Sequence, residues 1–196
     1  LTSVKLLHVL AQLLNLPEEA VRQSLNSQGI LSKSGLIAID RGGSYTLGGK
    51  LSLISDNFAD NIISTESDPI LLLRDMVAIG SQAELGMKDY IHITDTLTIL
   101  RPYLYQAISN KRKGVNIFLH GPPGTGKSQL TKAIAEELQC ELFEIASEDN
   151  EGDPISGKKR LRAFRAAQSF FGQRRALILF DEVEDVFNDG NELFGE

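Results

Sequence analysis

The C-terminal half of the chain alternates between apolar patterns typical of strands and apolar patterns typical of helices. Val115 to His120 is a short apolar run that predicts a buried strand, and Ala176 to Phe180 is an apolar run without polar alternation, as in a strand covered on both faces. Glu141 to Ala146 alternates apolar and polar residues and predicts another strand. Apolar residues recur at helical spacing in Gln129 to Gln139 and in Lys158 to Phe171. This order predicts an α/β unit with a parallel sheet and helices on both faces.

The N-terminal segment has a different pattern. Val4 to Leu14 places its apolar residues on one stripe, and a second helix is predicted to begin at Pro17 and to stop at Gly29. Leu36 to Ile39 and Tyr45 to Leu47 are predicted to pair as a β-hairpin around a glycine-rich turn. Helix, turn, helix and hairpin in this order resemble a winged helix-turn-helix.

A connecting segment joins these two parts. Ser55 to Ser67 begins as an apolar helix and becomes polar, and the following Asp-Pro pair is a typical helix start, so we expect a domain boundary here. Ile70 to Ile79 predicts an apolar helix that Gly80 closes. Lys88 to Ile93 is predicted to be extended, and Asp95 to Asn110 is predicted to be a helix.

A glycine-rich turn lies between the strand predicted at 115–120 and the helix predicted at 129–139. Its sequence, GPPGTGKS, fits the pattern G-x-x-x-x-G-K-[ST] at every fixed position. Glycines let the backbone curl until successive N–H groups point at one anion, and the start of the next helix adds unpaired N–H groups and a positive dipole end. We therefore predict a phosphate site. The residues predicted to bind a nucleotide are Gly121, Pro122, Pro123, Gly124, Thr125, Gly126, Lys127, Ser128 and Gln129.

Individual side chains at this site have expected roles. Lys127 is expected to act in catalysis by placing its charge on the outer phosphates, and the Ser128 hydroxyl is expected to ligate Mg²⁺. Asp181 and Glu182 directly follow a predicted strand, and ligands of open parallel sheets gather at the carboxyl ends of strands. We expect Asp181 to hold Mg²⁺ through its water shell and Glu182 to orient and deprotonate an attacking water.

Gly121 to Ser128 together with Phe180 to Asp185 resembles the Walker A and Walker B pair of the AAA+ ATPases, and the similarity covers roughly Tyr90 to Asn188. The resemblance implies the α/β fold of a P-loop NTPase core, ATP and Mg²⁺ as cofactors, and hydrolysis of ATP. It also implies that the backbone near Ile91 and His92 lines the adenine pocket. An ordinary half-buried histidine is the alternative for His92.

The family resemblance further implies a parent protein that uses ATP to remodel a protein substrate or adaptor and works as a homo-oligomeric ring, usually a hexamer. In this family a partner arginine and a helical lid lie beyond Walker B. The chain is therefore expected to be a piece of a longer protein that binds nucleotide weakly and turns it over little by itself. We divide it into a winged-helix-like accessory domain (1–66), a connecting helix and linker (67–87) and the N-terminal part of an AAA+ nucleotide-binding domain (88–196).

Other functions stay open. Asp149 to Gly152 fits the loose D-x-x-G pattern of GTPases, but the chain has no N-K-x-D motif. Ile155 to Gly157 occupies the place where many AAA+ unfoldases present an aromatic residue to a polypeptide, and no aromatic residue stands there. A nucleotide-gated scaffold is therefore an alternative. Because the chain starts with a helix-turn-helix-like segment, a DNA-acting AAA+ motor or transcription regulator is a further alternative.

Charge argues against nucleic acid as the partner. The 196 residues carry a net charge of −6, and residues 1–68 contain five basic and seven acidic residues, whereas phosphate binding needs clustered positive charge. The basic residues after the loop at 147–157 are expected on a solvated helix face, with nucleic acid or a neighbouring subunit's acids as alternatives; they are Lys158, Lys159, Arg160 and Arg162.

The remaining composition is that of a globular protein without a membrane span. Hydrophobic residues make up 42% and charged residues 23% of the chain, and no apolar run is long enough to cross a bilayer. The single cysteine, Cys140, excludes an internal disulfide and fits a reducing compartment, so the expected location is cytoplasmic.

Overall fold

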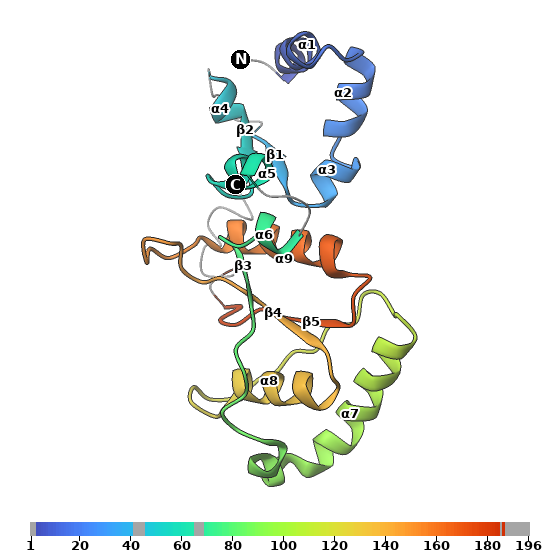
Figure 1. The fold of residues 1–196 in the computed structure, drawn as a ribbon, viewed down its shortest axis with the longest axis vertical. Coiled ribbons are helices and arrows are strands. Elements are labelled where there is room, and N and C mark those ends of the chain that lie inside the picture. The colour runs from blue at the N-terminus through green and yellow to red at the C-terminus, as the bar shows by residue number, and fades with distance from the viewer. Residues whose placement is uncertain (1–2, 41–45, 65–68, 185, 187–196) are drawn as a thin grey trace, which may run out of the picture.

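The computed structural model describes residues 3–40, 46–64, 69–184 and 186, which form an elongated arrangement with the N-terminal unit at one end (Figure 1). This unit contains a pair of short antiparallel strands in which Ile37 lies opposite Leu53. Its elements are α1 (Ser3–Leu14), α2 (Glu18–Leu25), α3 (Ile30–Lys33), β1 (Ile37–Ile39), α4 (Leu47–Lys50) and β2 (Leu51–Leu53). Helices form at both predicted places, but the second one ends at Leu25 and not at Gly29. The winged-helix assignment stays a prediction.

The partner strand predicted at 45–47 is not found at its described residues, 46 and 47. Leu47 belongs to α4, not to a strand, because the Thr46 side chain accepts a hydrogen bond of 3.1 Å from the Gly49 N–H and caps a helical turn. The strand that pairs with β1 follows this turn, as β2. Three predicted features lie outside the described residues: the glycine turn at 41–43, the domain boundary at 66–67 and the last position of the motif at 180–185.

The connecting segment folds differently from its prediction. After α5 (Phe58–Ser64), the predicted helix at 70–79 is reduced to α6 (Pro69–Leu72), and Val77–Ile79 forms the strand β3. β3 pairs antiparallel with the edge of β4 (Glu141–Ile145), where its backbone groups find partners and its β-branched residues are favourable. The segment predicted to be extended at 88–93 is a 3₁₀ helix, η1 (Met87–Ile93), which leads into α7 (Thr94–Ser109).

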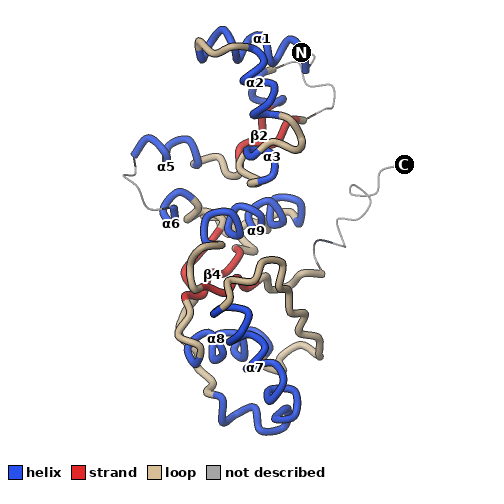
Figure 2. The backbone as a smooth tube through the Cα atoms, turned by 90° about the vertical axis from the view of Figure 1, so that its right-hand side faces the viewer, coloured by secondary structure: helices blue, strands red, loops and turns tan. Residues whose placement is uncertain are grey.

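The central sheet has the order β3-β4-β5, and β5 (Ala176–Leu179) runs parallel to β4. α9 (Gly157–Phe171) covers one face and α8 (Lys127–Glu137) covers the other (Figures 1 and 2). The α/β class with helices on both faces is therefore confirmed, with an antiparallel strand added at one edge.

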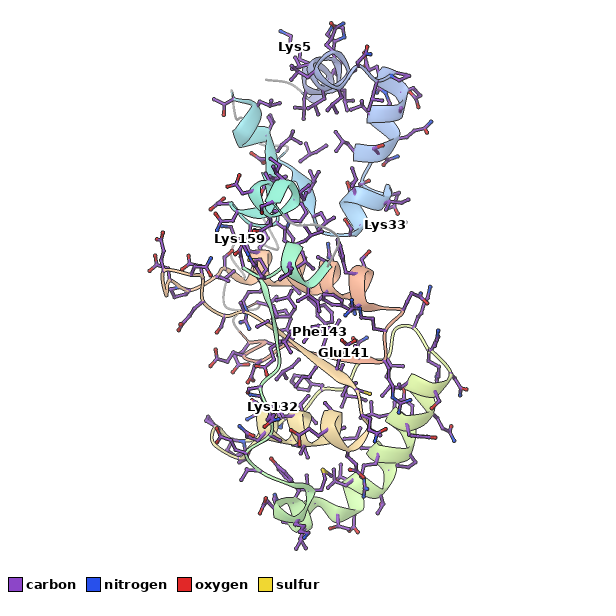
Figure 3. All side chains as sticks on the ribbon, viewed as in Figure 1. Lys5, Lys33, Lys132, Glu141, Phe143 and Lys159 are labelled. Carbon is purple, nitrogen blue, oxygen red and sulfur yellow. The ribbon has the colours of Figure 1, made fainter. Side chains whose placement is uncertain are left out.

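Two cores follow from the alternation of side chains along the strands. Phe143 stacks on Phe171 of α9 at 4.0 Å between ring centroids, in a cluster that also takes in α5 and β3 (Figure 3). Leu177 points the other way and packs with the cluster formed by α7 and α8. The sheet is thus the layer that joins the N-terminal side of the molecule to the glycine-rich turn.

The strand predicted at 115–120 is wrong for the described structure. No described strand pairs with these residues, and the Phe118 side chain is 73% exposed. A strand needs a paired neighbour for its backbone N–H and C=O groups, and this segment has none among the described strands. Among the described residues, no helix is both long and apolar enough to cross a membrane.

Candidate nucleotide-binding site

The glycine-rich turn is tightly curled. Gly124 and Gly126 have φ angles of 76° and 79°, which an L side chain rarely adopts, and the Thr125 hydroxyl donates to the Pro122 carbonyl at 2.9 Å. The Lys127 ammonium donates to the carbonyls of Gly121 and Pro122, both at 3.0 Å. Hydrogen bonds within the turn therefore stabilise its curled backbone, and they hold the Lys127 ammonium against the carbonyls of its first two residues.

The turn opens directly into α8, which begins at Lys127. The buried residues Leu130, Ala133 and Ile134 recur at helical spacing and hold this helix against the sheet and α7. The first N–H groups of a helix have no partner within it and carry the positive end of the dipole. An anion that enters the turn would meet these N–H groups together with the Lys127 charge, so the turn fits a phosphate group.

Ser128 and Asp181 are brought together from positions 53 residues apart. The Ser128 hydroxyl donates a hydrogen bond to Oδ2 of Asp181, which lies just past the carboxyl end of β5. A hydroxyl and a carboxylate oxygen are hard ligands of the type that Mg²⁺ prefers. This pair therefore fits the metal that the sequence predicts at these two residues.

Glu182 has an unusual backbone conformation. Its φ angle is 50°, in the left-handed region, and its N–H donates to Oδ1 of Asp181 at 3.0 Å. A cavity of about 190 Å³ lies beside the two acids. It is lined by Glu144, Ile145, Ser147, Arg160, Leu179, Asp181 and Glu182. A small polar space therefore adjoins the residue predicted to activate water.

The assignment of Ile91 and His92 to the adenine pocket stays a prediction. Ile91 and His92 lie in η1, and the Ile91 side chain is 75% exposed. The residue of this helix that meets the turn is Tyr90, which is 3% exposed and donates its hydroxyl to the Gly126 carbonyl at 3.0 Å. Burial raises the pKa of Tyr90, and the charge of Asp89 adds to this effect, so the hydroxyl keeps its proton. No sequence pattern singled out Tyr90, because its segment was predicted to be extended.

A strap at residues 80–86 fastens this region to α8. Gln129, predicted to touch the nucleotide, accepts a hydrogen bond of 2.8 Å from the Glu84 N–H through its side chain. Glu136 accepts one from the Ala83 N–H, also at 2.8 Å. Lys132 donates to the Ser81 hydroxyl at 2.8 Å and pairs with Glu144 at 3.3 Å (Figure 3). The strap thus connects β3 to the face of the helix that begins at the turn.

Of the basic residues expected on a solvated helix face, one is fully buried and another is half-buried. The Arg160 side chain is 0% exposed, and Arg162 bonds through its guanidinium to the N-terminal unit. Lys158 and Lys159 are exposed, as predicted. The missed signal was the helical period, because Arg160 precedes the buried Ala163 and Ala167 by three and seven positions and so shares their face.

Comparison with known proteins agrees with this geometry. Residues 117–194 match the family described as "ATPase family associated with various cellular activities (AAA)". The chain is 33% identical over 130 residues to the peroxisomal ATPase PEX6 of Neurospora crassa. It is 28% identical over 140 residues to vacuolar protein sorting-associated protein 4 of Dictyostelium discoideum, and 26% identical over 138 residues to fidgetin-like protein 1 of Caenorhabditis briggsae.

These alignments cover most of this chain but little of each relative. They span 66%, 70% and 69% of the chain, and 9%, 29% and 23% of PEX6, the sorting-associated protein and the fidgetin-like protein. The chain therefore spans less than a third of the length of each of these relatives. No solved structure matches the chain significantly.

Proposed function

We propose that the turn at 121–128 binds the phosphates of ATP and that Asp181 and Glu182 serve its hydrolysis, because residues 117–194 match the AAA ATPase family. The observation that carries the proposal is the contact between the Ser128 hydroxyl and the Asp181 carboxylate. It joins the end of the phosphate-binding turn to the end of β5, as a shared metal site requires.

Each residue has a proposed role in the reaction. Ser128 and Asp181 would hold Mg²⁺, and the bound ion would supply positive charge to the phosphate oxygens. The N–H groups of the turn position the phosphates, and Lys127 leaves the carbonyls of Gly121 and Pro122 to place its charge on the outer ones. Glu182 orients a water for in-line attack and accepts its proton. Tyr90 supports the turn from its outer side, through Gly126.

We also propose that the whole protein couples this hydrolysis to the remodelling of a protein substrate or adaptor and is active as a homo-oligomeric ring. Support comes from relatives whose names include a peroxisomal ATPase and a protein associated with vacuolar protein sorting. The loop triplet that would grip a polypeptide gives no support, because Ile155 is buried in the core beside the sheet. Light scattering of the whole protein with and without Mg-ATP tests for the hexamer that the family resemblance implies.

The nucleotide site is tested by thermal unfolding in the presence of Mg-ATP. A ligand at about a hundred times its dissociation constant adds about 2.7 kcal/mol to the free energy of unfolding. We expect Lys127→Ala to lose most of this gain. Lys132→Ala, on the same helix, is the matched control: it removes the ion pair with Glu144 but should keep the gain. A wild-type protein without any gain, or equal gains in the wild type and Lys127→Ala, would contradict the proposal.

The hydrolytic role of Glu182 needs a separate measurement on the whole protein. Glu182→Gln keeps the size of the side chain but removes the base. We expect ATP turnover to fall while the stabilisation by Mg-ATP remains, because the substitution leaves the phosphate-binding turn intact. Turnover that persists unchanged in this variant rules out the role given to Glu182.

A further inference from the structure

Arg160 is a fully buried cation beside the two acids at the end of β5. It belongs to the core-facing side of α9 and its guanidinium lies 4.7 Å from the centroid of the Phe180 ring. Nη2 donates to the main-chain carbonyl of Asp181 at 2.5 Å, and Nη1 donates to that of Glu182 at 3.2 Å. One side chain therefore binds the backbone of both acids at once.

The backbone that Arg160 binds is held in an unfavourable conformation. Glu182 has a φ angle of 50°, which non-glycine residues rarely adopt and which persists where surrounding contacts enforce it. Two such contacts are present: the Glu182 N–H donates to the Asp181 side chain, and the Glu182 carbonyl accepts from Arg160. Because φ sets the direction of the Cα–Cβ bond, these contacts determine the direction in which the Glu182 side chain leaves the backbone.

We propose that Arg160 is a positioning residue for ATP hydrolysis, which fixes the backbone of Asp181 and Glu182 so that both carboxylates keep their places at the metal and the attacking water. The inference rests on the proposed function of the two acids. The guanidinium of Arg160 donates to the carbonyl oxygens of both acids and lies over the ring of Phe180, so we assign it a role that acts through the backbone of the acids.

A positioning role differs from a merely structural one in what it changes. Lys127 donates to carbonyls of the phosphate-binding turn, whereas Arg160 donates to the carbonyls of Asp181 and Glu182, so loss of the guanidinium should leave nucleotide affinity nearly intact. The chemical step is more sensitive, because a misplacement of about 1 Å in a catalytic group can cost about a hundredfold in rate. If Arg160 had only a structural role, its loss would lower the midpoint of thermal unfolding, and kcat would not fall while the affinity for nucleotide stayed the same.

The test compares Arg160→Lys and Arg160→Met with Arg162→Lys in the whole protein. Arg162 lies on the same helix but binds Gly35, Leu36 and Ser52 of the N-terminal unit, so its variant controls for general loss of packing. For each variant the unfolding midpoint, the dissociation constant of Mg-ATP and kcat are measured. We expect both Arg160 variants to lower kcat by about tenfold to a hundredfold with the dissociation constant changed by less than about threefold. Arg162→Lys should lower the midpoint and leave kcat unchanged.

Each other outcome overturns the inference. Folded Arg160 variants with wild-type kcat remove the positioning role, and so does a fall in kcat that Arg162→Lys reproduces at an equal loss of stability. A wild-type protein that neither binds nor hydrolyses ATP overturns the proposed function and this inference with it. If both Arg160 variants fail to fold, Phe180→Leu removes the ring under the guanidinium instead. It should lower kcat by a smaller factor at unchanged affinity, and an unchanged kcat then overturns the inference.

Discussion

The phenol hydroxyl of Tyr90 donates a hydrogen bond of 3.0 Å to the carbonyl of Gly126, the left-handed residue through which the chain enters α8. The same carbonyl accepts the Leu130 N–H at 2.8 Å, so it is shared between the helix and the tyrosine. A Cβ atom built on Gly126 would lie 3.2 Å from the Tyr90 oxygen. The tyrosine is therefore packed directly against the phosphate-binding turn.

Tyr90→Phe is predicted to weaken nucleotide binding while the protein stays folded. The variant keeps the buried ring and loses one hydrogen bond, which is worth about 1 kcal/mol net and corresponds to about a fivefold rise in the dissociation constant of Mg-ATP. Titration of wild type and variant with a fluorescent ATP analogue measures the change. Tyr105→Phe, at an exposed position of α7, is the matched control and should bind as the wild type does. Equal affinity in all three proteins would show that this bond does not support the turn.

The buried hydroxyl of Tyr90 also predicts a dependence of stability on alkaline pH. Its pKa is raised in the folded protein, by burial first and by the Asp89 charge second, so the folded state holds the proton more tightly than the unfolded chain does. The stability that it contributes is complete below the ordinary tyrosine pKa of about 10 and is lost as the pH rises through the higher folded value. We expect the difference in unfolding free energy between wild type and Tyr90→Phe to shrink above about pH 10. A difference that stays constant from pH 8 to 11 would contradict this prediction.

Local pattern predicted the parts of the fold whose partners lie nearby in the sequence. The helical spacing of Leu130, Ala133 and Ile134 and the apolar run before Asp181 lie where the structure has α8 and β5. The approach of Asp181 to Ser128 was also foreseen, because the carboxyl ends of parallel strands meet the helix starts at one edge of a sheet. These features need only periodicity and a general rule of sheet topology.

Features that depend on distant partners were missed. Val77 and Ile79 form a strand because β4 offers an edge about 65 residues later in the chain, which a window of apolar residues cannot reveal. Residues 115–120 have strand-like composition but pair with no described strand, so composition alone predicted the wrong structure. The sequence predicts Arg160 on the surface because arginine is rarely buried unless it is paired, and the carbonyls that accept hydrogen bonds from its guanidinium lie 21 and 22 residues away.

The contact between the N-terminal unit and α9 is predicted to depend on Gly35. This glycine has a φ angle of +78°, and a Cβ atom there would lie 2.5 Å from the Arg162 carbonyl oxygen. Gly35→Ala should therefore cost about 2 kcal/mol or more in the free energy of unfolding. Gly48→Ala is the control, since a Cβ atom there meets nothing within 4 Å, and it should be neutral or slightly stabilising. Urea unfolding measures both, and equal stabilities of the two variants would contradict the predicted clash.

Asp75 is predicted to be the main polar anchor between α5 and the start of β3. Its Oδ2 atom accepts hydrogen bonds from the Ser55 hydroxyl and from Nδ2 of the fully buried Asn61, both at 3.1 Å. Asp75→Ala leaves the Asn61 amide without this acceptor, and an unsatisfied buried group costs about 1–3 kcal/mol. Asp56→Ala, at an exposed position, should change the free energy of unfolding by less than about 0.5 kcal/mol.

A second substitution separates the hydrogen bond from the loss of packing at Asp75. Oδ1 of Asn61 has no hydrogen-bond partner among the described residues, so the side chain relies on its Nδ2 contact with Asp75. Replacing both partners by apolar groups removes the unsatisfied donor, and Asp75→Ala with Asn61→Leu should therefore be more stable than Asp75→Ala alone. The double variant has no Asn61 amide, so an unsatisfied amide cannot lower its stability. A double variant that is less stable than Asp75→Ala would therefore mean that the cost comes from altered packing at the site.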